Sequence, residues 1–108
     1  MRRGEIWTVA GGPDYARKPR PMIIIQANEF SETATITLCG LTTTATEGPL
    51  GRLVIAPSAL NGLRSPSHVM VDKIASVAKS KLGYRIGRLD HEDITRLNSH
   101  LKIFLDLA

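Results

Sequence analysis

The sequence contains a single cysteine, Cys39, so no internal disulfide can form. Cys39 lies in an alternating apolar segment, where a cysteine usually serves as a small core residue rather than as a nucleophile. Histidine is also scarce, and His68 has no second histidine or cysteine at a spacing that suits a metal-ligand set. The sequence therefore predicts a fold without disulfides, without a metal site and without a cofactor.

Long hydrophobic runs are absent as well. A membrane-spanning helix needs about 20 consecutive apolar residues, and the sequence contains no such run. The first residues, Met1–Glu5, are not followed by the apolar segment of a signal peptide. We therefore expect a cytoplasmic protein without a membrane partner. With 108 residues, of which 43% are hydrophobic, the chain is expected to form one compact domain over residues 1–108.

Acidic side chains are in the minority. The sequence has 10 aspartates and glutamates against 14 lysines and arginines, which gives a formal net charge of +4. A basic balance in a small protein favours a polyanionic partner such as RNA, DNA or an acidic protein segment. The charge alone does not choose among these partners, and a small basic protein need not bind nucleic acid at all.

The segment Lys18–Gln26 combines two prolines, an arginine and a short apolar run. Each proline fixes its own φ near about −65° and favours extended geometry in the residue before it, so Arg20 is held extended at the start of a strand. The run Met22–Ile25 does not alternate, which predicts an interior strand covered on both faces. A guanidinium fixed at the mouth of a buried strand suits a phosphate ligand. An extended linker with a solvated arginine would show the same local pattern.

Aromatic, basic and hydroxyl side chains flank this segment in the sequence. Tyr15, Arg17 and Lys18 place an aromatic ring beside cations, a mixture that suits base stacking and phosphate contacts, although a solvated loop has similar residues. The strand expected after this segment runs into three successive threonines, Thr42, Thr43 and Thr44. Hydroxyls at a strand end can donate to a phosphate, but threonine is also common in ordinary strands and turns.

Further strands are indicated by alternating and β-branched segments. They are expected over Gly4–Val9, Ala34–Leu41, Arg52–Ile55, His68–Asp72 and Ile74–Ala78. A turn is expected over Lys79–Tyr84. Asp72 and Lys73 lie between the last two of these strands, where we expect them to form an ion pair; the edge of a site is the alternative.

The segment after Asp90 is the clearest helix. Asp90 suits the N-cap position, and acidic residues in the first turn favour the helix dipole. One apolar stripe is expected to pack on the sheet, formed by Ile94, Leu97, Leu101, Phe104 and Leu105. Short strands joined by glycine- and proline-rich turns and followed by a helix predict a mainly β fold of the α+β class, built as a small antiparallel barrel with a C-terminal α-helix.

Several of these motifs, together with the closing helix, resemble those of the MazF/PemK toxins of type II toxin–antitoxin systems. They are Arg3–Trp7, Lys18–Pro21, Leu41–Thr43 and Met70–Ile74, the last followed by Val77, Lys81, Leu82, Ile86 and Gly87. The motifs occur in order, at family-like spacing, over essentially the whole chain.

The resemblance implies an SH3-like barrel that is usually a homodimer and that cleaves single-stranded RNA at short sequences without a metal. It also implies a cognate MazE-like antitoxin, acidic and partly disordered, that blocks the RNA groove. The arginine of the family's Arg-Pro pair falls on Arg20, and the threonine that closes the third strand falls on Thr42, so these two positions carry over as catalytic. Nearby RNA-binding candidates are Tyr15, Arg17, Lys18, Thr43 and Thr44.

One departure from the family pattern lies in the first loop. Many members carry a Ser-Glu-Gln-type segment there, and this chain has Asp14–Arg17 instead. A loop carboxylate would therefore have to be Asp14, or be absent. Arg20 stays protonated and is no general base, so the sequence identifies no proton acceptor for the reaction.

Two other functions remain open from the sequence. A toxin of the same fold can poison DNA gyrase, as CcdB-like proteins do, but that mode relies on a tryptophan-containing C-terminal tail. This chain ends Phe104–Ala108 without a tryptophan, which argues against gyrase poisoning. A barrel that binds RNA without cleaving it is the other alternative.

Overall fold

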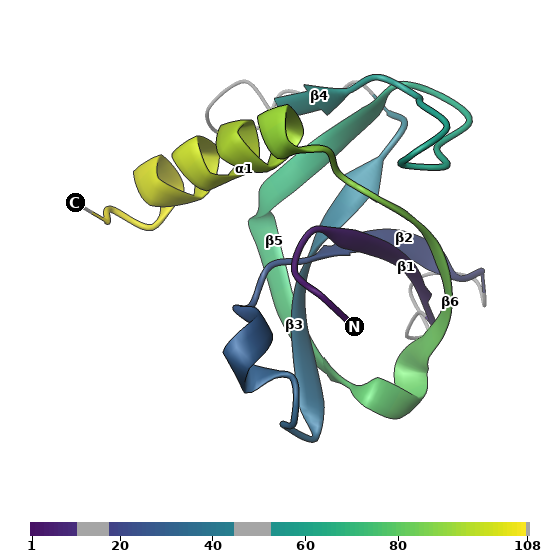
Figure 1. Cartoon of the computed structure of the whole chain (residues 1–108), viewed down its shortest axis with the longest axis vertical. Coiled ribbons are helices and arrows are strands. Elements are labelled where there is room, and N and C mark those ends of the chain that lie inside the picture. The colour runs from purple at the N-terminus through teal and green to yellow at the C-terminus, as the bar shows by residue number, and fades with distance from the viewer. Residues whose placement is uncertain (11–17, 45–52, 108) are drawn as a thin grey trace.

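The computed structural model describes residues 1–10, 18–44 and 53–107. Within these ranges six strands form one sheet, which is followed by a C-terminal helix (Figure 1). The elements are β1 (Glu5–Val9), β2 (Arg20–Ile24), the 3-10 turn η2 (Asn28–Phe30), β3 (Thr35–Thr42), β4 (Leu53–Ile55), β5 (Ser67–Ala78), the 3-10 turn η3 (Lys79–Lys81), β6 (Leu82–Arg88) and α1 (His91–Phe104).

All neighbouring strands are antiparallel, in the order β4-β5-β3-β2-β1-β6. Figure 1 shows the sheet strongly curved. The predicted class, mainly β with a C-terminal helix, is confirmed. The sheet curves as a barrel would, but it is not closed: over the described residues, β4 pairs with β5, β6 pairs with β1, and no pairing joins β4 to β6.

The prediction of two strands at residues 68–78 is wrong, because a single strand, β5, spans Ser67–Ala78. Its pairing with β3 shifts in the middle: Gly40 lies opposite Met70, and the preceding residue of β3, Cys39, lies opposite Ile74. The segment Val71–Lys73 is thus inserted as a bulge. A bulge interrupts the alternation of side chains without ending the strand, which is why the sequence suggested a break.

The predicted turn over Lys79–Tyr84 is correct only for its first part. The 3-10 turn η3 ends at Lys81, and the strand β6 follows and pairs with β1. Two glycines made this segment resemble a turn in the sequence, but β6 packs so closely on its neighbours that only glycine fits at these positions. A Cβ at Gly83 would overlap the Thr8 hydroxyl, and one at Gly87 would overlap the backbone of Asn61.

Strand β2 lies in the interior of the sheet and is covered on both faces, as its unalternated sequence predicts. Ile23 packs on the face that α1 covers, with Leu97 and Leu101 of the helix in the same cluster. Ile24 packs on the other face, with Ile36 and Leu38 of β3. Two small apolar clusters therefore hold β2 in place from both sides.

Cys39 is fully buried in the cluster that includes Ile23, and burial raises the pKa of its thiol to about 12. The prediction of a core cysteine is confirmed. A thiol with this pKa stays protonated at neutral pH and is a poor nucleophile.

Helix α1 begins as predicted, since Asp90 Oδ1 accepts a hydrogen bond from Asp93 N–H (2.8 Å). Leu97 and Leu101 of the helix are buried, but Phe104 and Leu105 are 39% and 45% exposed. The predicted stripe therefore packs only in part, because the last turn of α1 extends past the sheet (Figure 1). Among the described residues, no helix combines the length and the apolar character that a membrane span requires.

Candidate active site

The register of β2 and β3 brings Arg20 and Thr42 to the same place. Met22 lies opposite Gly40, and the same antiparallel register, continued for two residues, sets Arg20 opposite Thr42. Side chains two residues apart on a strand share a face, so both residues belong to the face that carries Met22 and Gly40. Arg20 and Thr42 line one cavity of about 630 Å³. Two residues that are 22 positions apart in the sequence thus meet at one surface site.

Arg20 is the first residue of β2 and lies opposite Val9, the last residue of β1. It is exposed, as a side chain that binds a phosphate from solvent must be. The neighbouring strand β1 is fixed at its other end by Glu5, a buried carboxylate with several donors. The position of Arg20 therefore depends on a strand that is anchored in the sheet.

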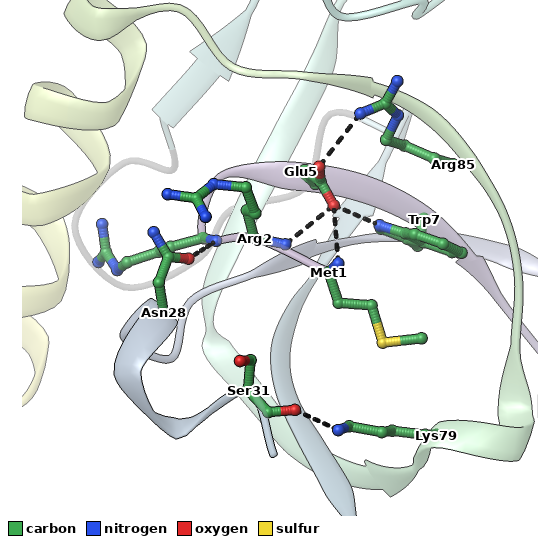
Figure 2. A network of polar contacts seen from close by, with 9 residues as sticks. Met1, Arg2, Glu5, Trp7, Asn28, Ser31, Lys79 and Arg85 are labelled. Carbon is green, nitrogen blue, oxygen red and sulfur yellow. Dashed lines mark hydrogen bonds and ion pairs between the residues drawn. The ribbon is translucent and has the colours of Figure 1, made fainter. Parts of the chain in front are cut away.

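Figure 2 shows the Glu5 network at close range. Glu5 Oε1 accepts hydrogen bonds from the Arg2 N–H (2.9 Å) and from Trp7 Nε1 (3.0 Å), and Oε2 accepts one from the Arg85 guanidinium (3.1 Å). Burial acts to raise the pKa of Glu5, but these hydrogen bonds outweigh it and hold the pKa below its ordinary value. The network connects β1 to β6.

The same view shows Lys79 of η3 donating to the Ser31 carbonyl after η2.

Thr42 is the last residue of β3 and is half-buried. Its Oγ1 accepts a hydrogen bond from Thr44 N–H (3.2 Å), so the hydroxyl oxygen is oriented by the chain that leaves the strand. A hydroxyl that accepts one hydrogen bond can still donate its proton to another group. Thr42 can therefore act as an oriented donor. His68, half-buried on β5, lies opposite Thr42 in the register but not among the residues that line the cavity.

The bulge of β5 adds two charged residues to the same cavity, Asp72 and Lys73. Lys73 Nζ lies 3.9 Å from Asp72 Oδ2, which confirms the expected ion pair, and both residues line the cavity. The Asp72 side chain is 14% exposed and that of Lys73 is 66% exposed. Among the described residues that line the cavity, Asp72 is the only carboxylate. Asp72 belongs to the bulge, which the sequence did not reveal, and lines the same cavity as Arg20 and Thr42.

The remaining wall of the cavity is largely apolar, with side chains from three strands: Val9, Met22, Met70, Ile74 and Val77. Most of them are only half-buried. An apolar wall beside cationic and hydroxyl groups is the usual make-up of a small-molecule or nucleotide site, because it excludes water and offers contact to a ring. Among the described residues, no three histidine, cysteine, aspartate or glutamate side chains gather as a metal site would require.

The other predicted RNA-binding residues are placed differently. Thr43 lines a second cavity, and Thr44 is exposed with its N–H bound to Thr42. Lys18 is exposed just before β2 and does not line the first cavity. Tyr15, Arg17 and the possible loop acid Asp14 lie outside the described residues.

Comparison with known proteins gives matches over the whole length. Residues 2–105 match the family described as PemK-like, MazF-like toxins of type II toxin–antitoxin systems. The chain is 43% identical over 108 residues to a protein of Mycolicibacterium smegmatis named probable endoribonuclease MazF, with 100% of this chain and 99% of that protein covered.

Solved structures with the same fold include a mycobacterial endoribonuclease in complex with its cognate antitoxin, at a TM-score of 0.81 and 24% identity, with 100% of this chain and 97% of that chain covered. They also include the Mycobacterium tuberculosis toxin MazF-mt6, at a TM-score of 0.79 and 26% identity, with 96% and 98% covered.

Proposed function

Because the chain belongs to the PemK-like, MazF-like toxins of type II toxin–antitoxin systems, we propose that it is an endoribonuclease toxin that cleaves single-stranded mRNA and so inhibits translation and growth. The observation that carries this proposal is the shared cavity of Arg20 and Thr42. A cationic fork and an oriented hydroxyl on neighbouring strands suit a phosphodiester between them.

The proposed reaction uses the RNA's own 2′-hydroxyl as the nucleophile. The 2′-oxygen loses its proton and attacks the adjacent phosphorus, the bond from phosphorus to the 5′-oxygen breaks, and the leaving 5′-oxygen takes up a proton from water. The products are a 2′,3′-cyclic phosphate and a 5′-hydroxyl. Negative charge grows on the non-bridging oxygens in the transition state. Arg20 and Thr42 would donate to these oxygens, and a preorganised donor of this kind is typically worth about 3–4 kcal/mol of barrier.

For the proton of the 2′-hydroxyl we propose Asp72 as the acceptor. It is the only carboxylate among the described residues of the cavity, and the bulge that carries it lines that cavity together with Arg20 and Thr42. A positioned general base typically contributes about 10²- to 10⁴-fold to the rate. Asp72→Asn, which keeps the size and removes the basicity, should slow cleavage by about that factor. A His68→Gln variant tests the other titratable group near Thr42 and should have a much smaller effect.

We propose that no metal ion takes part, because Arg20 supplies the positive charge that a metal would otherwise bring to the phosphate. The partner that we propose is an acidic, partly disordered antitoxin of the MazE type, which would compete with RNA for the cationic site, since segments of this kind fold on binding. A homodimer and a cytoplasmic location, where mRNA is found, complete the proposal.

The experiment that tests this function is primer extension on one long RNA incubated with the purified protein, with and without EDTA. The wild type should give discrete cleavage sites in both conditions, and Arg20→Ala should give none while its circular dichroism spectrum is unchanged. Arg96→Ala, which changes an arginine on the exposed side of α1, is the matched control and should cleave like the wild type. Cleavage by Arg20→Ala at the wild-type rate, or trapping of gyrase on DNA without any RNA cleavage, would contradict the proposal.

A further inference from the structure

A second cavity, of about 500 Å³, lies next to the first. It is lined by Thr43, Leu63, Arg64, Tyr84 and Ile86, among others. Pro21 lines both cavities, and Thr43 follows Thr42 directly. The two cavities therefore meet near Pro21, at the start of β2.

One wall of this second cavity is a loop that is fastened to β6. Asn61 is 2% exposed, and its Oδ1 accepts hydrogen bonds from Ser58 N–H (2.9 Å) and Leu63 N–H (3.0 Å). Gly62 has φ +68°, and a Cβ there would overlap the carbonyl oxygen of Ile86. The loop therefore sits directly on β6 with no space between them. This packing fixes the segment that carries Arg64 next to the strand that carries Tyr84.

The wall formed by β6 presents an aromatic ring. Tyr84 is 68% exposed, more than any other large hydrophobic or aromatic side chain among the described residues. Its backbone is nevertheless well held, because its N–H donates to Thr8 Oγ1 (3.0 Å) within the sheet. An exposed ring on a rigid strand is a ready stacking partner for a base. Without a ligand to contact, so exposed a position would suit a polar side chain better than an aromatic ring.

The charge of the second cavity favours an anion. Its described lining residues include Arg64 and Arg85 and no acidic side chain. The Arg85 guanidinium is tied to Glu5 by one nitrogen and remains 57% exposed, whereas Arg64 is exposed at the rim. Cations beside an exposed aromatic ring are the combination by which proteins hold single-stranded nucleic acid.

We propose that this second cavity binds a nucleotide that flanks the cleavage site, with Tyr84 stacked on its base and Arg64 against a phosphate. The inference rests on the proposed function and deepens it, since it gives the RNA strand a path out of the first cavity. A strand held between Arg20 and Thr42 would leave the site past Pro21, which lines both cavities, and past Thr43, which lines the second. Tyr84 and Arg64 then help to set which flanking bases are accepted.

The test is the affinity for RNA, measured by fluorescence anisotropy. The probe is a fluorescein-labelled single-stranded RNA with the mapped cleavage site and 2′-fluoro sugars, which lack the attacking hydroxyl; a mixed-sequence RNA serves if no cleavage is found. Tyr84→Ala should raise the Kd about 5- to 150-fold, the effect of one lost base stack, and Tyr84→Phe, which keeps the ring, should bind like the wild type. Arg64→Ala should lower the slope of log K against log salt by roughly 1.

Matched controls lie outside both cavities. Phe30→Ala removes another exposed ring, in η2, and Arg96→Ala removes an exposed arginine of α1; both should leave the Kd unchanged. A substrate shortened to the cleaved nucleotides should be cut equally well by the wild type and by Tyr84→Ala, because it does not reach the second cavity.

The outcomes separate this inference from the proposed function. If the wild type cleaves RNA but Tyr84→Ala binds it with unchanged Kd, the inference is wrong and the proposed function stands. If the wild type cleaves no RNA, the proposed function fails, and the binding data on the mixed-sequence RNA still decide whether Tyr84 stacks on a base. If Tyr84→Ala weakens only the binding of an acidic antitoxin peptide, or only self-association, the cavity is a protein interface and the inference is overturned.

Discussion

Replacing Thr42 by valine is a sharp test of the proposed site, because the two side chains have nearly the same shape. The substitution removes Oγ1, the atom that accepts the hydrogen bond from Thr44 N–H. Thr44 is exposed, so its N–H can bind water instead and the free energy of unfolding should fall by less than about 1 kcal/mol. Loss of a donor to the transition state should cost far more in rate, about 3–4 kcal/mol or 10²- to 10³-fold in kcat.

The assay is single-turnover cleavage of a short labelled RNA, with unfolding in urea measured on the same preparations. Thr42→Ser keeps the hydroxyl and should retain most of the activity. Thr35→Val is the matched control, since it removes an exposed threonine hydroxyl of the same strand that lines neither cavity. If Thr42→Val cleaves within about threefold of the wild type, well below the loss expected for such a donor, Thr42 does not stabilise the transition state and our assignment is wrong.

The remaining predictions concern the fold that holds the site. Glu5→Gln should lower the free energy of unfolding by about 1–3 kcal/mol at neutral pH. Because folding lowers the pKa of Glu5, the wild type's extra stability is complete above the ordinary glutamate pKa of 4.5 and is lost as the pH falls through the lowered pKa. Urea unfolding at several pH values can check this. Cys39 should not react with iodoacetamide at pH 8 in the folded protein and should react in denaturant, as mass spectrometry can show; rapid modification of the native protein would refute its burial. Asp90→Ala should lower the free energy of unfolding by about 1 kcal/mol through loss of the helix cap, and Leu97→Ala should lower it by about 2–5 kcal/mol because it leaves a cavity. Both are measured by urea unfolding, and equal effects of the two changes would contradict the packing described for α1.

Local sequence patterns were sufficient for the elements whose cause is local. The prolines on either side of Arg20 fix the entry of β2, and the cap at Asp90 fixes the start of α1. Strand β6 was missed because its reason for being a strand lies elsewhere in the chain. Gly83 and Gly87 look like turn residues in the sequence, but they are needed where β6 packs against Thr8 and Asn61.

The candidate site was predictable only in part. Arg20 and Thr42 were identified from motifs that resemble those of a known family, and the register of β2 and β3 then brings them to one cavity. Asp72 was named but not assigned to the site, because nothing in the sequence distinguishes a bulge from the end of a strand. Tyr84 and Arg64 were not singled out, since they are distant in the sequence and meet only through the packing of a loop on β6.

The most direct test of the proposed mechanism is a crystal structure of the protein with a single-stranded oligonucleotide that carries a 2′-deoxy sugar at the cleaved position. We expect the Arg20 guanidinium and Thr42 Oγ1 to lie within about 3 Å of oxygens of the same phosphate, the one that follows the deoxy sugar. A scissile phosphate that is bound elsewhere, or that contacts neither side chain, would contradict our account.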